Sequence, residues 1–257
     1  AHAAETGVMA TIAASKGVTG ALDVLEGPAG MGAAMSGNAD WRKATSGLGK
    51  IYNIEAITFK NHGCCGHTFA AIDGLLFIMQ DAQITANDIA NIAIATYGPA
   101  VSITDRIDPK TPQECKFSMQ YVLAHAAHYG SVRIEAFEAE RMSDPAIQAM
   151  LGQIDLSTDP AVDAEFPARR AAHVTITTKD GRQLTHYQPT RKGDPDLPLT
   201  DDELDAKFIE LANPVLGNEL TNSLLQKLWQ LDEISLATAL DFTVLKGNHT
   251  AGKNLPN

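Results

Sequence analysis

The stretch from Lys60 to Thr68, KNHGCCGHT, gathers the side chains of this chain that are best suited to chemistry. It holds one lysine, two histidines and two adjacent cysteines, separated by two glycines. Three kinds of site could use these groups: a metal centre, a redox pair of thiols, or a pocket for an anion. A helical pattern of apolar residues follows from Thr68 to Gln80, so the stretch leads directly into a predicted helix.

A metal centre and a redox pair both fit the spacing poorly. Adjacent cysteines do not easily bind one tetrahedral zinc ion together, and no second CxxC or HxxxH pair occurs in the chain. A disulfide between Cys64 and Cys65 would be strained, because disulfide geometry is specific. The two thiols can instead be small buried side chains beside the helix. We therefore predict that this stretch holds no metal ion.

An anion pocket uses more of the stretch. We predict a strand over residues 52–60, then a glycine-containing turn, then the helix. The backbone N–H groups near Cys65 and Gly66 would lie at the helix start, where they carry partial positive charge. Lys60 adds a full charge, and either histidine can donate or accept a proton. This arrangement suits a carboxylate, although Lys60 taken alone can also be a solvated surface lysine.

Other candidate residues are less specific. Tyr121 is expected in the core with its hydroxyl at an edge. Arg191 lies in a predicted loop, where solvated charge is the ordinary expectation. His125 and His128 lie three apart on a predicted helix and could share a site, but core or surface histidines are the simpler interpretation.

Composition limits the partners of the chain. Its 257 residues carry a net charge of -11, which argues against general affinity for nucleic acid or anionic membranes. No window of about 20 apolar residues occurs, so we expect no membrane span. Three cysteines, two of them adjacent, form a poor disulfide framework, and we expect a reducing, cytoplasmic location.

The order of predicted elements indicates an α+β fold, with a mixed helix and sheet domain flanked by segments of a mainly helical domain. A hairpin is predicted over residues 173–188 around Asp180-Gly181. Thr111 and Thr200 each begin a capping box, and we expect one helix from Thr111 to Gly130. The predicted divisions are 1–45 (end of the helical domain), 46–195 (α+β domain), 196–245 (C-terminal helices returning to the helical domain, the last over 234–240) and 246–257 (disordered tail).

Four segments, in this order, resemble those of one protein family: HAAETGVMATIAASKGVTGALDVLEGPAG, FKNHGCCGHTFAAIDGLL, KFSMQYVLAHAAHYG and KGDPDLPLTDDELDAKF. The chain resembles the MmgE/PrpD family, which includes 2-methylcitrate dehydratase, cis-aconitate decarboxylase and iminodisuccinate epimerase. The resemblance implies a helical domain formed by both chain ends around a smaller α+β domain. It also implies that a longer segment precedes Ala1, in which a second family lysine and further acids and histidines would lie.

The resemblance assigns roles to single residues. The family's active-site lysine falls on Lys60, and the segment from Cys64 to His67 lies where the family lines its cleft. Gly63 stands where many members have proline. Phe69 stands where relatives often have histidine, and His67 lies two residues earlier. On this basis Lys60 is the expected carboxylate-binding cation, His67 the proton-transfer candidate, and the backbone near Cys65 and Gly66 an anion donor, with Tyr121 and Arg191 as weaker substrate-binding candidates.

The resemblance further implies the chemistry. The substrates would be small di- or tricarboxylates that lose a proton next to a carboxylate, with no metal or organic cofactor. We expect elimination of water as in 2-methylcitrate dehydratase, with epimerisation or decarboxylation as alternatives, and a homodimer. A hypothesis from another class stays open: the chain is a non-catalytic assembly or dimerisation module, in which its leucine-striped C-terminal helices bind a partner.

Overall fold

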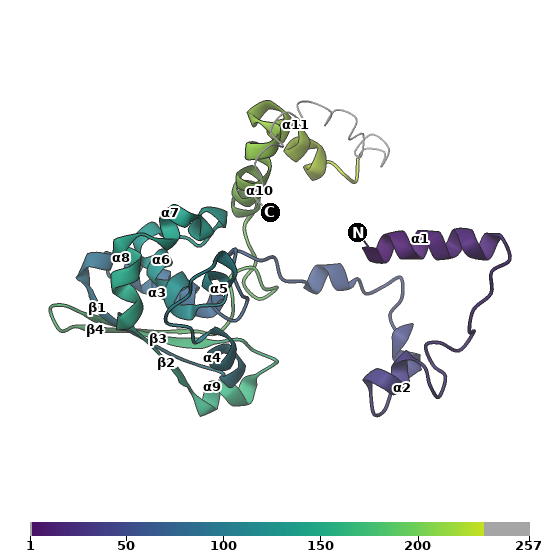
Figure 1. Cartoon of the computed structure of the whole chain (residues 1–257), viewed down its shortest axis with the longest axis horizontal. Coiled ribbons are helices and arrows are strands. Elements are labelled where there is room, and N and C mark those ends of the chain that lie inside the picture. Colours follow the sequence, from purple (N-terminus) through teal and green to yellow (C-terminus); the bar gives the residue numbers. More distant parts are fainter. Residues whose placement is uncertain (1, 234–257) are drawn as a thin grey trace. The chain divides into compact units, whose positions relative to one another are not determined.

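The computed structural model describes residues 2–233, and the chain divides into two compact units, Ala1–Ile54 and Glu55–Asn257 (Figure 1). This division falls nine residues after the boundary predicted at 45/46, since 54 − 45 = 9. The predicted last helix, 234–240, and the predicted tail, 246–257, lie outside the described residues. Within the described part, no helix is long and apolar enough to cross a membrane.

The first unit holds a long helix and several short turns. Helix α1, His2–Ser15, buries none of its residues within this unit, and Gly17 follows it with φ +91°. Residues 22–26 form turns. Helix α2, Met31–Met35, and the 3-10 turn Trp41–Ala44 pack together where Gly32 meets the Trp41 ring.

The second unit is built on a mixed sheet of four strands in the order β2-β1-β3-β4. Its strands are β1 (Ile89–Thr96), β2 (Ile154–Thr158), β3 (Ala172–Thr178) and β4 (Gln183–Gln188). β1 runs parallel to β2 and antiparallel to β3, and β3 and β4 form the predicted hairpin. The α+β prediction is therefore confirmed, while β2 was not predicted.

Helix α3, Phe69–Asp81, packs against β3 and β4 and covers one face of the sheet (Figure 1). Seven of its residues are buried, because its apolar side chains recur at helical spacing toward the sheet. Gly74 permits the close approach, since a Cβ there would lie 2.8 Å from Val174 Cγ2. Helix α6, Met119–Tyr129, packs on α3 and completes this layer of the core.

The single helix predicted over 111–130 is two helices. Thr111 and Glu114 form the predicted capping box of α5, Pro112–Lys116. Ser118 then starts α6, because its side-chain oxygen accepts the N–H of Tyr121 at 3.0 Å. Short helices fill the remaining connections: α4 (Gly98–Thr104), α7 (Ala139–Met142), α8 (Pro145–Met150) and α9 (Pro160–Glu165).

Two helices follow the proline-rich linker. α10, Asp201–Leu216, begins with the predicted capping box of Thr200 and Glu203. It packs against α11, Asn218–Trp229. Both belong to the second unit. Their predicted membership of a helical domain formed by both chain ends stays a prediction.

The predicted strand over 52–60 is wrong. The segment forms a 3-10 turn, Asn53–Ala56, and is then irregular up to Lys60. Its apolar residues suggested a strand, but a strand needs a partner along its length. The segment from Thr58 to Lys60 has backbone pairing at only one point, where the Phe59 N–H donates to Gly193 O at 2.9 Å.

Candidate functional site

Thr58 and Phe59 lie just before the loop of residues 60–68, and they are held in place by a second loop, residues 190–194. Thr58 Oγ1 donates to Asp194 Oδ1 at 2.6 Å, one residue before the Phe59 contact with Gly193. Gly193 has φ +98°, and a Cβ there would lie 2.0 Å from Phe59 O. Only glycine fits this position, because both the backbone conformation and the space exclude a side chain.

Asp73 joins the same two segments from helix α3. Its Oδ1 lies 3.0 Å from His62 Nε2, and its Oδ2 accepts the Lys192 N–H at 2.7 Å. His62 is 5% exposed and packs edge-on against Phe69. One carboxylate therefore binds the His62 ring, two residues after Lys60, and the backbone of Lys192, next to Arg191.

The loop between Lys60 and helix α3 is anchored by hydrogen bonds of its backbone. The Gly63 N–H donates to Val132 O, and the Cys65 N–H donates to Lys116 O. Cys64 lies in the core, where burial raises the pKa of its thiol to about 12. The Cys65 N–H is thus already hydrogen-bonded and is not free to bind an anion, contrary to our expectation. Of the two predicted backbone donors, only Gly66 has an N–H without an acceptor among residues 2–233.

Lys60 lies on a cavity of about 270 Å³ that we call the Lys60 cavity. It is lined by residues 60–64, residues 133–134, Lys207 and residues 210–211. Lys60 is exposed and makes only a long contact, 3.5 Å, with Cys64 O. Its ammonium group is therefore free to bind a ligand in this cavity.

Two further cations reach the Lys60 cavity. Lys207 Nζ donates to Lys60 O at 2.6 Å, and Arg133 donates to Asn61 Oδ1 at 3.2 Å and pairs with Glu210 at 3.6 Å. Burial and the positive charges of Arg133 and Lys60 lower the pKa of Lys207, although Glu210 acts in the opposite direction. The cavity thus presents three cations against one carboxylate, which suits a ligand with several negative charges.

His67 lies on the other side of the loop and does not line the Lys60 cavity. Its Nδ1 lies 2.8 Å from the Tyr97 hydroxyl. Burial lowers the pKa of His67, and the positive charges of Arg170 and Arg191 lower it further. The ring is therefore neutral at pH 7, in surroundings that disfavour a second positive charge.

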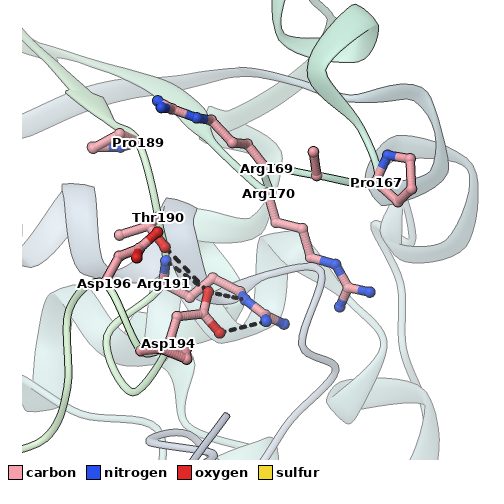
Figure 2. Close-up of a pocket in the computed structure, with 10 residues that line it drawn as sticks. Pro167, Arg169, Arg170, Pro189, Thr190, Arg191, Asp194 and Asp196 are labelled. Atoms are coloured by element: carbon pink, nitrogen blue, oxygen red, sulfur yellow. Dashed lines mark hydrogen bonds and ion pairs between the residues drawn. The ribbon is translucent and has the colours of Figure 1, made fainter. Parts of the chain in front are cut away.

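Arg191 is not a solvated loop charge. Its guanidinium forms two hydrogen bonds with Asp194, at 2.9 and 2.6 Å, and one with Thr58 Oγ1 at 3.1 Å. Arg191 and Asp194 line a second cavity, of about 480 Å³, whose walls are residues 167–170, 189–191 and 194–196 (Figure 2). We call it the arginine cavity, since Arg169 and Arg170 line it too.

Tyr121 lies in the core. It has no exposed surface, its hydroxyl donates to Ala136 O, and burial raises the pKa of that hydroxyl. It lines neither cavity. We therefore leave Tyr121 out of the proposed site and assign it a packing role.

Comparison with known proteins decides the family. Residues 62–231 match the MmgE/PrpD C-terminal domain. The chain belongs to the MmgE/PrpD family. Cis-aconitate decarboxylase of Mus musculus is 25% identical over 250 residues, which are 93% of this chain and 50% of that protein. The Homo sapiens protein of the same name is 23% identical over 252 residues, 96% of this chain and 52% of that protein.

A second group of relatives matches a shorter part of this MmgE/PrpD chain. 2-Methylcitrate dehydratase of Cupriavidus necator is 32% identical over 105 residues, 39% of this chain and 22% of that protein. The chain spans about half the length of the decarboxylases that it matches. The family match begins at His62, two residues after Lys60, so the role of Lys60 rests on the resemblance of the surrounding stretch and on its cavity.

Sequence reasoning missed two of the three cations of this family member. Lys207 lies within the quoted segment that ends in DAKF, but nothing in that pattern brings it to Lys60. Arg133 follows the end of α6 and carries no motif. In residues 2–233, no three His, Cys, Asp or Glu side chains gather as ligands for a metal ion.

Proposed function

We propose that this MmgE/PrpD family member binds a small di- or tricarboxylate in the Lys60 cavity. We propose that it then removes a proton next to one carboxylate and eliminates water. One observation carries the proposal: Lys60, Arg133 and Lys207 converge on a single cavity of a chain whose net charge is -11. Cations gathered against the overall charge point to a function in binding anions.

The same cations would assist the chemistry. When a proton leaves a carbon next to a carboxylate, negative charge builds up on the carboxylate oxygens. Fixed positive groups stabilise that charge more than they stabilise the bound substrate, which lowers the barrier. Lys60, which is nearly free of protein contacts, is the proposed carboxylate-binding cation.

The proton-transfer role is better filled by Lys207 than by His67. His67 lies outside the lining of the Lys60 cavity, whereas Lys207 lines it. A lysine with a lowered pKa is more often neutral at pH 7 and can accept a proton. Lys207 is therefore the proposed base, and the role expected for His67 moves to it.

Decarboxylation is the second candidate reaction. It is favoured by the match to cis-aconitate decarboxylase, which extends over 93% of this chain. Loss of CO2 leaves its electron pair on the substrate carbon, where the same cations would stabilise the charge. The ammonium form of Lys207 would then supply the proton that replaces CO2. Elimination remains first because the shorter match to 2-methylcitrate dehydratase has the higher identity.

Binding and turnover test the proposal separately. Lys60→Met should weaken 2-methylcitrate binding, measured by calorimetry, by about 10- to 100-fold, since a hydrogen bond to a charged group contributes about 1.5–3 kcal/mol. Lys179→Met, in the exposed turn of the hairpin, is the control and should leave binding unchanged. Equal affinities of the two variants would exclude Lys60 from the site.

NMR in D2O identifies the reaction. The chain is incubated with 2-methylcitrate and with cis-aconitate, and deuterium exchange, loss of water and loss of CO2 are followed. A chain that binds these anions but causes none of the three changes would support a binding or assembly role instead. Sedimentation of the chain tests the expected homodimer.

A further inference from the structure

The arginine cavity shares no lining residue with the Lys60 cavity. Its volume of about 480 Å³ exceeds that of the Lys60 cavity. Three arginines, Arg169, Arg170 and Arg191, line it, and the proposed reaction in the Lys60 cavity uses none of them. The presence of these positive charges is therefore not explained by the proposed function.

Arg191 is held rigidly but keeps donors free. Its Nε and Nη2 atoms are bound to Asp194 and Thr58, which fixes the plane of the guanidinium. Its Nη1 has no hydrogen-bond acceptor within residues 2–233. Gly66 is next to this atom, since a Cβ on Gly66 would lie 3.2 Å from Nη1. The absence of a side chain there keeps the space in front of Nη1 open.

Arg170 is a second free guanidinium. In the part of the chain that the structure describes, it forms no hydrogen bond or ion pair, and its guanidinium carbon lies 5.9 Å from the centre of the Phe166 ring. Arg169, in contrast, lies 3.7 Å from the carboxylate of Glu165. Figure 2 shows that the side chains of Arg169 and Arg170 leave the backbone in opposite directions.

Arg170 and Arg191 line the same cavity. The positive charges of both side chains also lower the pKa of His67, in addition to the effect of burial. Tyr97, whose hydroxyl is bonded to His67, experiences the same two charges. Two positive charges that line one cavity repel, and an anion bound between them offsets this repulsion.

We propose that Arg170, Arg191 and the Gly66 N–H form a second anion site, separate from the Lys60 cavity, that binds a small oxyanion. Guanidinium groups bind phosphate and carboxylate oxygens through paired N–H donors. The Gly66 N–H adds a backbone donor next to Arg191. The same donors would bind a ligand that carries either a phosphate group or a terminal carboxylate group.

The site is tested by titrating the whole chain with inorganic phosphate and, in a second arm, with acetate, while the His67 ring signals are followed by NMR. Phosphate or acetate should shift these signals and raise the pKa of His67, because the anion offsets the two positive charges. Arg170→Gln should weaken the binding at least tenfold. Arg182→Gln removes a positive charge from the exposed hairpin turn, outside the lining of this cavity, and should change the binding less than twofold.

Two further variants separate this site from the Lys60 cavity. Gly66→Ala, which crowds Arg191 Nη1, should weaken phosphate or acetate binding in a chain with unchanged circular dichroism. Lys60→Met should leave that binding unchanged, although it weakens 2-methylcitrate binding if the proposed function is right. Equal losses from Arg182→Gln and Arg170→Gln, no effect of Arg170→Gln, or competition between phosphate and 2-methylcitrate would each overturn the proposal of a separate site.

Discussion

Arg191 and Asp194 form a two-point ion pair that also holds Thr58, a residue 136 positions earlier than Asp194. Their side chains are only 12% and 13% exposed. The pair therefore serves two purposes at once. It joins the segment that carries Lys60 to the loop before α10, and it fixes the guanidinium that faces Gly66.

Asp194→Asn should destabilise the chain by about 2–3 kcal/mol, because it leaves the charge of Arg191 without its partner in a largely buried position. The substitution keeps the shape of the side chain, so packing is preserved. Urea unfolding measures the change. Asp196→Asn, at an exposed position of the same loop, is the control and should stay within about 0.5 kcal/mol of the original chain.

The pH dependence of this effect has a defined sign. Burial alone would raise the pKa of Asp194, but the hydrogen bonds from Arg191 and Thr58 and the charge of Arg191 lower it on balance. A lowered pKa contributes stability above the unfolded value, and that contribution is lost as the pH falls through the folded value. The difference between the original chain and Asp194→Asn should be constant above about pH 5 and should shrink below about pH 4. A difference that grew on acidification would contradict the assignment.

Two glycines with similar φ angles should respond differently to alanine. Gly193 has φ +98° and no room for a Cβ, whereas Gly181 has φ +90° and nothing within 4 Å. Gly181→Ala should cost about 1 kcal/mol, from backbone strain alone. Gly193→Ala should cost about 3 kcal/mol or more, since the clash with Phe59 O adds to the strain. Thermal unfolding of the two variants checks the order, and equal costs would refute the close contact.

The pKa of Lys207 should move in opposite directions when its neighbours change. Arg133→Gln should raise it, because a nearby positive charge is removed, and Glu210→Gln should lower it further. NMR titration of the lysine side-chain signals gives both values. A rise in the pKa of Lys207 in Glu210→Gln would contradict the placement of the Glu210 carboxylate near Lys207.

The three cysteines should differ in reactivity. Burial raises the pKa of Cys64 to about 12 and that of Cys115 to about 11, whereas Cys65 is only partly buried. A thiol reagent attacks the thiolate, so at pH 8 the native chain should show one rapidly reacting thiol. Cys65→Ser should remove this rapid phase. Rapid reaction of two thiols in that variant would show that the loop is open.

Features that depend on neighbouring residues could be predicted from the sequence. The capping boxes at Thr111 and Thr200 and the hairpin around Gly181 each lie within a few residues, and all three are present. Strand β2 was missed because it has only five residues, IDLST, and its pairing with β1 spans a long stretch of chain. The strand expected over 52–60 does not form, because its residues favour an extended backbone but have no partner strand to pair with.

Only those residues of the candidate site that lie close together in the sequence could be predicted. Lys60 and Gly66 lie in one quoted stretch; Lys60 lines its cavity, and Gly66 lies next to Arg191. Lys207, in contrast, reaches Lys60 from 147 positions away, and sequence spacing says nothing about such a contact. Spacing also suggested that Lys60 and His67 share one pocket, but anchoring of the loop at Gly63 and Cys65 places His67 beside Tyr97 instead.

The Lys60 cavity is lined by residues from distant parts of the chain, and this has a consequence for biosynthesis. A ribosome releases residues 60–64 long before it releases Lys207 and Leu211, and the hydrogen bond from Phe59 to Gly193 also waits for the later segment. A nascent chain arrested before the start of α10 therefore has Lys60 and Arg133 but lacks Lys207 and residues 210–211 of the cavity lining. Such a chain can have a folded sheet and hairpin, but under the proposed function it should bind no polycarboxylate until residues 207–211 have been released and folded.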